Sequence, residues 1–179
     1  MQVKDVMTKD VICVQPDETV AVASRLMARH NLGVLAVCGK DGKLKGMVTD
    51  RDVVLRCVAA DEDPAELKVK QVMTRRVVTV DPEDSLETAS RRMAAQQVRR
   101  LPVVQEDRLA GMVSLADLTR KPELRMEVAE ALCDICDPVR KEKLRQGIPF
   151  PRRFIEPAGA LFFKISKQIF KNSDLPDFV

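Results

Sequence analysis

Residues 46–52 read GMVTDRD, and residues 111–117 read GMVSLAD. Each stretch has a glycine, a hydroxyl-bearing residue three positions later and an aspartate three positions after that. The similarity extends outward: with Val3 aligned to Val69 and one residue lost at the turn near Gly42, about 21 of about 50 positions are identical. The chain therefore contains an internal duplication, and its fold has to be built from two copies of one unit.

The periodicity of the first copy predicts its secondary structure. A β-branched run at 11–14 predicts a buried strand, and helical spacing of apolar residues follows over 19–31. Residues 33–49 predict a β-hairpin, and a second helix begins directly after Thr49. The second copy has the same order, with the buried strand expected at 77–80 and the first helix at 85–97. A β-α-β-β-α unit of about 60 residues is too small to bury its sheet alone, so we expect an α/β (α+β) fold of two packed repeats.

The composition is that of a folded protein with a core. Of 179 residues, 45% are apolar and 32% are charged. No run of eighteen apolar residues is present and residues 1–10 lack the apolar stretch of a secretory signal, so the cytoplasm is the expected compartment and no transmembrane segment is predicted. Thirty basic and 27 acidic side chains leave a net charge of +3, which is too balanced to predict nucleic-acid binding.

The residues that usually carry catalysis or bind metal are sparse. The five cysteines are Cys13, Cys38, Cys57, Cys133 and Cys136. Their odd number and wide spacing do not suggest a disulfide framework, so reduced thiols are expected. The pair Cys133 and Cys136 forms a CxxC, but the only histidine, His30, is distant, so a metal site or redox pair there is the less favoured reading. No nucleophile with a base is recognisable, so we predict no catalytic residues, no metal site and no enzyme.

The repeated motifs resemble a tandem pair of cystathionine β-synthase (CBS) domains, known as a Bateman module. The resemblance rests on VMT before each first strand, the turns at Pro16 and Pro82, VRRLPVV at 98–104, and G-M-V-[ST]-x-x-D in both copies. It covers residues 1 to about 120 and implies pseudo-twofold packing, sheet against sheet, with two clefts that commonly hold adenosine-containing ligands. It also implies a homodimer, because apolar helix faces such as those around Val53, Val54 and Val58 usually meet a second copy in this family.

The repeated hydroxyl and aspartate have two readings. A capping box would use Thr49 or Ser114 as the cap and Asp52 or Asp117 as its reciprocal partner, with no ligand. Alternatively, the start of the helix and the hydroxyl would face a phosphate, while the carboxylate would accept from the hydroxyls of a ribose. The residues alone favour capping, the resemblance favours nucleotide contact, and the two roles can coexist.

The two copies are not equivalent. The second has Arg99 and Arg100 where the first has Gly33 and Val34, and the resemblance implies phosphate contact by such an arginine. In the first copy Asp50 adds negative charge beside the expected phosphate, so that cleft is predicted to bind anions less well. Because Trp and Tyr are absent and all six Phe lie at 150 or later, the adenine base would lie between aliphatic side chains. The candidate nucleotide-binding residues are Thr49, Asp52, Val78, Arg99, Arg100, Leu101, Pro102, Ser114 and Asp117.

The last third of the chain does not repeat. We therefore divide the sequence into repeats at 1–65 and 66–121 and a helical, basic and aromatic extension at 122–179. An apolar stripe in the extension predicts a packed helix through Leu124, Val128, Leu132 and Ile135. A basic run from 140 to 153, interrupted by IPFP, and a short basic amphipathic helix at 160–171 follow. The extension could cover the repeats or a dimer partner, enter a groove of another protein, or touch a membrane surface or nucleic acid.

These observations predict a non-catalytic regulatory module that senses AMP, ADP, ATP or a related adenosine ligand such as S-adenosylmethionine. It would require no cofactor and would act on an unknown protein partner in trans. The alternative hypothesis is a protein-interaction scaffold whose function is carried by residues 122–179, without a physiological nucleotide.

Overall fold

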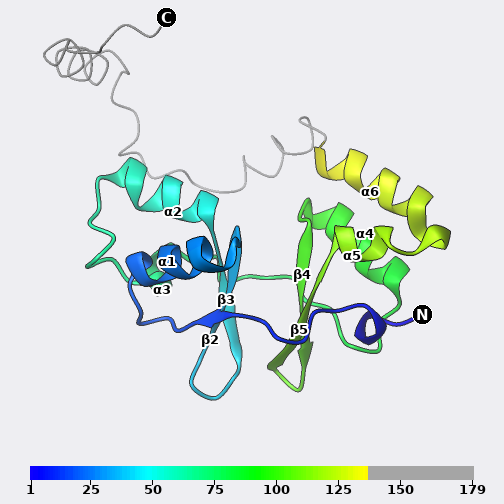
Figure 1. The fold of residues 1–179 in the computed structure, drawn as a ribbon, viewed down its shortest axis with the longest axis horizontal. Coiled ribbons are helices and arrows are strands. Elements are labelled where there is room, and N and C mark those ends of the chain that lie inside the picture. Colours follow the sequence, from blue (N-terminus) through cyan, green and yellow to red (C-terminus); the bar gives the residue numbers. More distant parts are fainter. Residues whose placement is uncertain (137–179) are drawn as a thin grey trace, which may run out of the picture. The chain divides into compact units, whose positions relative to one another are not determined.

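The chain folds as two similar α/β halves, which follow one another in sequence (Figure 1). The structure is a computed structural model that describes residues 1–136. The basic run, the IPFP link and the amphipathic helix predicted after residue 136 lie outside the described residues. No helix within the described part is long and apolar enough to cross a membrane.

The first repeat contains a three-stranded sheet with its strands in the order β1-β2-β3. Strands β1 and β2 are parallel, and β2 and β3 form the antiparallel hairpin expected from the sequence. The elements are η1 (Val3–Asp5), β1 (Cys13–Val14), α1 (Val20–His30), β2 (Val34–Cys38), β3 (Leu44–Thr49), α2 (Asp50–Arg56) and η2 (Val58–Ala60).

The second repeat follows the same core order, but it begins with a short α-helix where the first has the 3-10 helix η1, its first strand is missing, and it ends in an additional helix. The apolar run at 77–80, predicted as a strand, is reduced to a single parallel bridge between Val80 and Val103, which matches the pairing of Val14 with Val37 in the first repeat. The elements are α3 (Val69–Val72), α4 (Leu86–Gln96), β4 (Arg100–Gln105), β5 (Arg108–Ser114), α5 (Leu115–Thr119), η3 (Pro122–Leu124) and α6 (Arg125–Cys136).

Local sequence explains the limits of the first helix in each repeat. The hydroxyl of Thr19 accepts from the N–H of Val22 at the start of α1, and Ser85 caps α4 in the same way. Asn31 and Gln97 end the two helices in the left-handed conformation, with φ of 51° and 52°. The predicted helices at 19–31 and 85–97 are therefore confirmed, with the outermost residue at each end acting as a cap.

The segment that precedes each repeat's first strand packs against the other repeat. We call residues 3–8 (VKDVMT) and 69–74 (VKQVMT) the lead-in segments. Val3 is fully buried in the core of the second repeat, whereas Val69 and Val72 are buried in the core of the first. The duplication therefore gives a reciprocal exchange and not two independent domains.

Backbone hydrogen bonds complete this exchange. Thr8 pairs with Met112 of β5 through two N–H···O bonds of 2.9 Å, and Thr74 pairs with Met47 of β3 through bonds of 2.8 and 2.9 Å. Because the same pairing occurs twice with the repeats exchanged, the two halves are related by the expected pseudo-twofold symmetry. A third apolar cluster, which includes Ala36 and Met47 with Val77 and Met112, fills the space between the two sheets.

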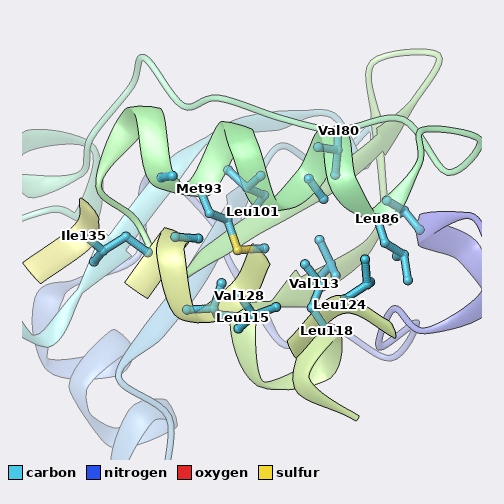
Figure 2. Packing of buried hydrophobic residues seen from close by; sticks show 14 of the residues in the cluster. Val80, Leu86, Met93, Leu101, Val113, Leu115, Leu118, Leu124, Val128 and Ile135 are labelled. Carbon is cyan, nitrogen blue, oxygen red and sulfur yellow. The ribbon is translucent and has the colours of Figure 1, made fainter. Parts of the chain in front are cut away.

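The helix α6 packs on α4 and α5 (Figure 1) and extends the hydrophobic core of the second repeat. Figure 2 shows Val128 and Ile135 of this helix among the buried residues of that core. The predicted stripe was wrong at one position: Ala131 is buried, whereas Leu132 is 45% exposed. The small Ala131 side chain lets the helix lie close to its neighbours, and Leu132 is one residue further around the turn. The core reaches Ile135, although the sequence placed the start of the extension at 122.

The glycine of each G-M-V motif is required by the reciprocal pairing. A Cβ on Gly46 would lie 2.5 Å from the carbonyl oxygen of Thr74, and one on Gly111 would lie 2.9 Å from that of Thr8. These are main-chain atoms that are held by hydrogen bonds, so they cannot move aside without breaking the pairing.

We predict that Gly46→Ala destabilises the protein by about 2 kcal/mol, the usual magnitude for an atom forced into a packed site. Urea unfolding measured by circular dichroism checks this. Gly33→Ala is the matched control, because its Cβ would meet only the exposed carboxylate of Asp50, which can rotate away. Equal stability of the two variants would contradict the proposed role of Gly46.

Candidate functional site

The hydroxyl and aspartate of the first repeat form a capping box at the start of α2. The Thr49 hydroxyl accepts from the N–H of Asp52 at 3.0 Å, and Asp52 Oδ2 accepts from the Thr49 N–H at 3.0 Å. The hydroxyl also donates its own proton to Oδ2 at 2.8 Å. The capping interpretation is therefore confirmed for this pair.

The same box occurs at the start of α5. Asp117 Oδ2 accepts from the N–H of Ser114 at 2.9 Å and from its hydroxyl at 2.5 Å, while the Ser114 oxygen accepts from the N–H of Asp117 at 3.3 Å. Since a hydroxyl has one proton to donate, neither Thr49 nor Ser114 can serve a phosphate without first leaving its aspartate.

The first amide of each helix is also occupied. The N–H of Asp50 donates to the carbonyl of Gly33 at 3.1 Å, and the N–H of Leu115 donates to that of Arg99 at 2.9 Å. The helix starts thus offer fewer free donors than the sequence suggested. A phosphate placed at either helix start would therefore depend mainly on side-chain donors.

The second oxygen of each aspartate distinguishes the repeats. Asp52 Oδ1 lies 3.2 Å from a guanidinium nitrogen of Arg56, which also donates to the carbonyl of Val72. Asp117 Oδ1 lies 3.6 Å from Arg120, whose side chain is 77% exposed compared with 46% for Arg56. An exposed, long ion pair contributes little to stability, so the Asp117 carboxylate is easier for a ligand to engage than that of Asp52.

The strand beside each aspartate differs in charge. Arg100 lies opposite Ser114 in the register of the β4–β5 hairpin, so the two side chains point to the same face of the sheet. Arg99 and Arg100 are exposed, and neither forms an ion pair within residues 1–136. At the matching place in the first repeat, a Cβ on Gly33 would lie 3.1 Å from the carboxylate of Asp50. The first site is therefore acidic where the second is basic.

The three apolar candidates do not lie together. Leu101 is 1% exposed and is packed in the core of the second repeat beside Met93 and Leu115 (Figure 2). Val78 packs against the same core, whereas Pro102 is buried on the opposite face of β4, opposite Met112. The sequence interpretation grouped these three as aliphatic side chains that could flank a base, although consecutive strand residues point to opposite faces. That alternation would have identified Val77, which packs between the sheets and which we did not select.

Two pockets lie beside the point where the tips of the hairpins pair, at Lys43 and Arg108. The first-repeat pocket, with a volume of about 540 Å³, is lined by residues that include Lys9, Cys13, Cys38, Lys40 and Arg108. The second-repeat pocket, with a volume of about 360 Å³, is lined by residues that include Lys43, Arg75, Val77, Thr79 and Val104. Neither pocket is lined by Asp52 or Asp117.

Comparison with known families assigns both halves. The family model described as CBS domain matches residues 3–58 and 69–123. The chain is 42% identical over 133 residues to the CBS domain-containing protein YhcV of Bacillus subtilis, covering 74% of this chain and 94% of that protein. It is 36% identical over 137 residues to Hypoxic response protein 1 of Mycobacterium tuberculosis, covering 76% and 94% of the respective chains.

Solved structures show the same fold. Hypoxic Response Protein I, crystallised with two coordinated zinc ions, matches with a TM-score of 0.63 and 38% identity over 67% of this chain and 98% of that chain. Residues 1–136 of this chain bring together no group of three or more His, Cys, Asp or Glu that could hold a metal. The CBS domain pair of protein MJ0100, in complex with 5'-methylthioadenosine and S-adenosyl-L-methionine, matches with a TM-score of 0.60 and 25% identity over 67% and 94% of the two chains.

We predict that Ser114→Ala lowers the free energy of unfolding by about 1 kcal/mol, because a capping hydroxyl is lost from α5. Ser114→Thr is the matched control, since threonine holds the equivalent position in the first repeat. Urea unfolding of both variants measures the difference. If Ser114→Ala unfolds at the same urea concentration as the unmodified protein, the capping box has no energetic role.

Proposed function

This chain belongs to the CBS domain family, and on that premise we propose that it is a non-catalytic regulatory module that binds an adenosine-containing ligand and acts on a partner protein in trans. The main support is the arrangement in the second repeat, where Arg100, Ser114 and Asp117 lie at one end of the β4–β5 hairpin. The ligands of the MJ0100 domain pair show that a related fold accommodates adenosine compounds.

Asp117 suits a ribose for a geometric reason. Its Oδ2 is held by the capping box, which fixes the orientation of the carboxylate, while among residues 1–136 the one polar contact of Oδ1 is the 3.6 Å approach of Arg120. We propose that Oδ1 accepts hydrogen bonds from the ribose hydroxyls and that Arg120 swings into solvent. Capping and ligand binding then use different oxygens of one side chain, so they do not compete.

Phosphate would be bound by the arginines. Arg100 points to the same side of the hairpin as Ser114, and Arg99 is adjacent in the chain. Both guanidinium groups are exposed and can form bidentate hydrogen bonds with a phosphate. We propose that the two arginines contact the phosphates of AMP, ADP or ATP. Pro102 and Val77 would pack against the base. Leu101 and Val78 would support the strand from the core of the second repeat.

The first repeat would bind such a ligand less well. Asp52 Oδ1 is engaged by Arg56, which is itself anchored to the carbonyl of Val72, and so is less available to a ribose. The carboxylate of Asp50 would repel a phosphate at this site. We therefore propose one strong site beside Asp117 and a weaker or phosphate-free one beside Asp52 and Thr49.

Calorimetric titration tests these assignments with two probes, AMP and 5'-methylthioadenosine, which share the adenosine group but differ in phosphate. Asp117→Asn should weaken both by about 1 to 3 kcal/mol, because ribose hydroxyls lose a charged acceptor. Arg100→Val, which installs the first-repeat residue, should weaken AMP and leave methylthioadenosine unchanged.

Asp52→Asn is the matched control for the titration and should have the smaller effect. If neither probe binds the folded chain at millimolar concentration, the proposal fails. If AMP binds and Asp117→Asn leaves the affinity unchanged, the aspartate acts in capping alone and the ligand lies elsewhere.

We also propose that the chain forms a homodimer through α2 and η2. Val54 and Val58 are 54% and 63% exposed, and Leu55 beside them is exposed as well. Arg51 lies near one end of this apolar surface, and the acidic residues 61–63 lie near the other. In an antiparallel twofold pairing, the basic end of one copy meets the acidic end of its partner.

We predict that the double substitution Val54→Asp and Val58→Asp shifts the protein from a dimer to a monomer of 20.0 kDa. Sedimentation velocity over a range of concentrations measures the shift. Met126→Asp is the control, because Met126 is an exposed apolar residue on α6 and outside the proposed contact. A dimer that resists the double substitution would place the interface on another face.

A further inference from the structure

Two thiols meet on neighbouring strands of the first repeat. Cys13 begins β1, Cys38 ends β2, and the two strands are parallel neighbours. The Cys38 Sγ–H points at Cys13 Sγ, with the sulfur atoms 3.5 Å apart. Cys13 is exposed and Cys38 is 7% exposed, so only one of the pair is open to solvent.

The duplication shows that the fold does not require these cysteines. The equivalent residues of the second repeat are Thr79 and Val104, which line the second-repeat pocket as Cys13 and Cys38 line the first. The same backbone is therefore built with a hydroxyl and an aliphatic side chain at these places. The pair of thiols is therefore a feature of the first-repeat pocket that the fold itself does not need.

The chemistry of the pair is asymmetric. The hydrogen bond from Cys38 lowers the pKa of the Cys13 thiol to about 7, whereas the same contact and burial raise the pKa of Cys38. At a pH below its pKa a thiol is mostly protonated and is a poor nucleophile. At neutral pH Cys13 therefore supplies the reactive thiolate, and Cys38 keeps its proton. An accessible thiolate beside a shielded second thiol is the arrangement found at reversible oxidation sites.

We propose that Cys13 and Cys38 form an oxidation site, at which hydrogen peroxide converts the two thiols into an intramolecular disulfide. The Cys13 thiolate attacks one peroxide oxygen, the O–O bond breaks, and a sulfenic acid forms as hydroxide leaves and takes up a proton. The Cys38 sulfur then attacks the sulfenic sulfur, the S–O bond breaks, and the oxygen departs as water with the Cys38 proton. One peroxide and two thiols give one disulfide and two waters.

The other described cysteines provide the contrast. Cys57 is fully buried, its Sγ–H donates to the carbonyl of Glu62, and burial raises its pKa. Cys133 and Cys136 are exposed on α6 and lie three residues apart. They have to be replaced before the reaction of Cys13 can be measured, because they would react with the same reagents.

The experiment uses the full chain with Cys133→Ser and Cys136→Ser, treated with hydrogen peroxide. The expected result is an intact mass that falls by two hydrogen atoms. Tryptic peptides 10–25 and 30–40 should remain joined until a reductant is added. Oxygen addition to Cys13 without this link, a link between two chains, or an unchanged mass would each overturn the proposal.

Cys38→Val, which copies the second repeat, is the decisive variant. Without the hydrogen bond, alkylation of Cys13 by iodoacetamide at pH 7 should slow about fivefold, since the loss of thiolate outweighs its gain in nucleophilicity. With peroxide, this variant should take up oxygen on Cys13 and form no link. Cys13→Thr should leave Cys38 unmodified by either reagent. An unchanged alkylation rate in folded Cys38→Val would show that the contact does not activate Cys13.

Discussion

The reciprocal pairing of the two lead-in segments is the constraint on which this structure depends. Each segment leaves its own repeat, hydrogen-bonds to the last strand of the other, and places a valine in the other core. The backbone approach is so close that only glycine fits at positions 46 and 111. A unit of this size cannot bury its sheet alone, and the exchange lets each copy complete the core of its mate. The same exchange sets the positions of the candidate sites, because it holds the strands β3 and β5, which lead directly into the capped helices α2 and α5.

Duplication followed by divergence explains why similar ends of the two repeats differ in chemistry. Both keep the hydroxyl and the aspartate, and in both the pair caps a helix, so stability alone is a reason for them to persist. What surrounds the pair has diverged. Arg99 and Arg100 make the second site basic, and its Asp117 is only loosely paired with Arg120. Asp50 makes the first site acidic, and its Asp52 is paired more closely with the anchored Arg56. Beside the hairpin tips, the two neighbouring cysteines that we propose to be oxidised, Cys13 and Cys38, belong to the first repeat, and the second repeat has Thr79 and Val104 in their place. The proposed ligand and the proposed oxidation thus occupy separate regions of the module.

The geometry of the repeated hydroxyl and aspartate could be predicted because it is local, whereas the face of the sheet to which each apolar candidate points could not. Thr49 with Asp52, and Ser114 with Asp117, were found because a capping box is a matter of spacing along the chain. Val78 and Leu101 were chosen as aliphatic side chains that could flank a base where no aromatic ring is present, and both pack toward the second core. The contact between Cys13 and Cys38 could not be read from a separation of 25 residues, because it depends on which strands are neighbours. Leu132 was placed on the packed side of its helix because spacings of three and four residues both occur along such a face, and only the neighbouring helices decide between it and Ala131.

The sequence by itself determined the duplication, the order of strands and helices, the caps that begin and end the helices, and the hydroxyl and carboxylate that recur. These properties depend on residues within a few positions of one another, and local hydrogen bonding and hydrophobic periodicity are enough to specify them. Only the tertiary structure decided which repeat receives each lead-in segment, which oxygen of Asp117 remains available, and which two cysteines meet. Those outcomes arise from contacts between segments that are distant in the chain. Such contacts form only when the core packs, so the spacing of residues along the sequence does not specify them.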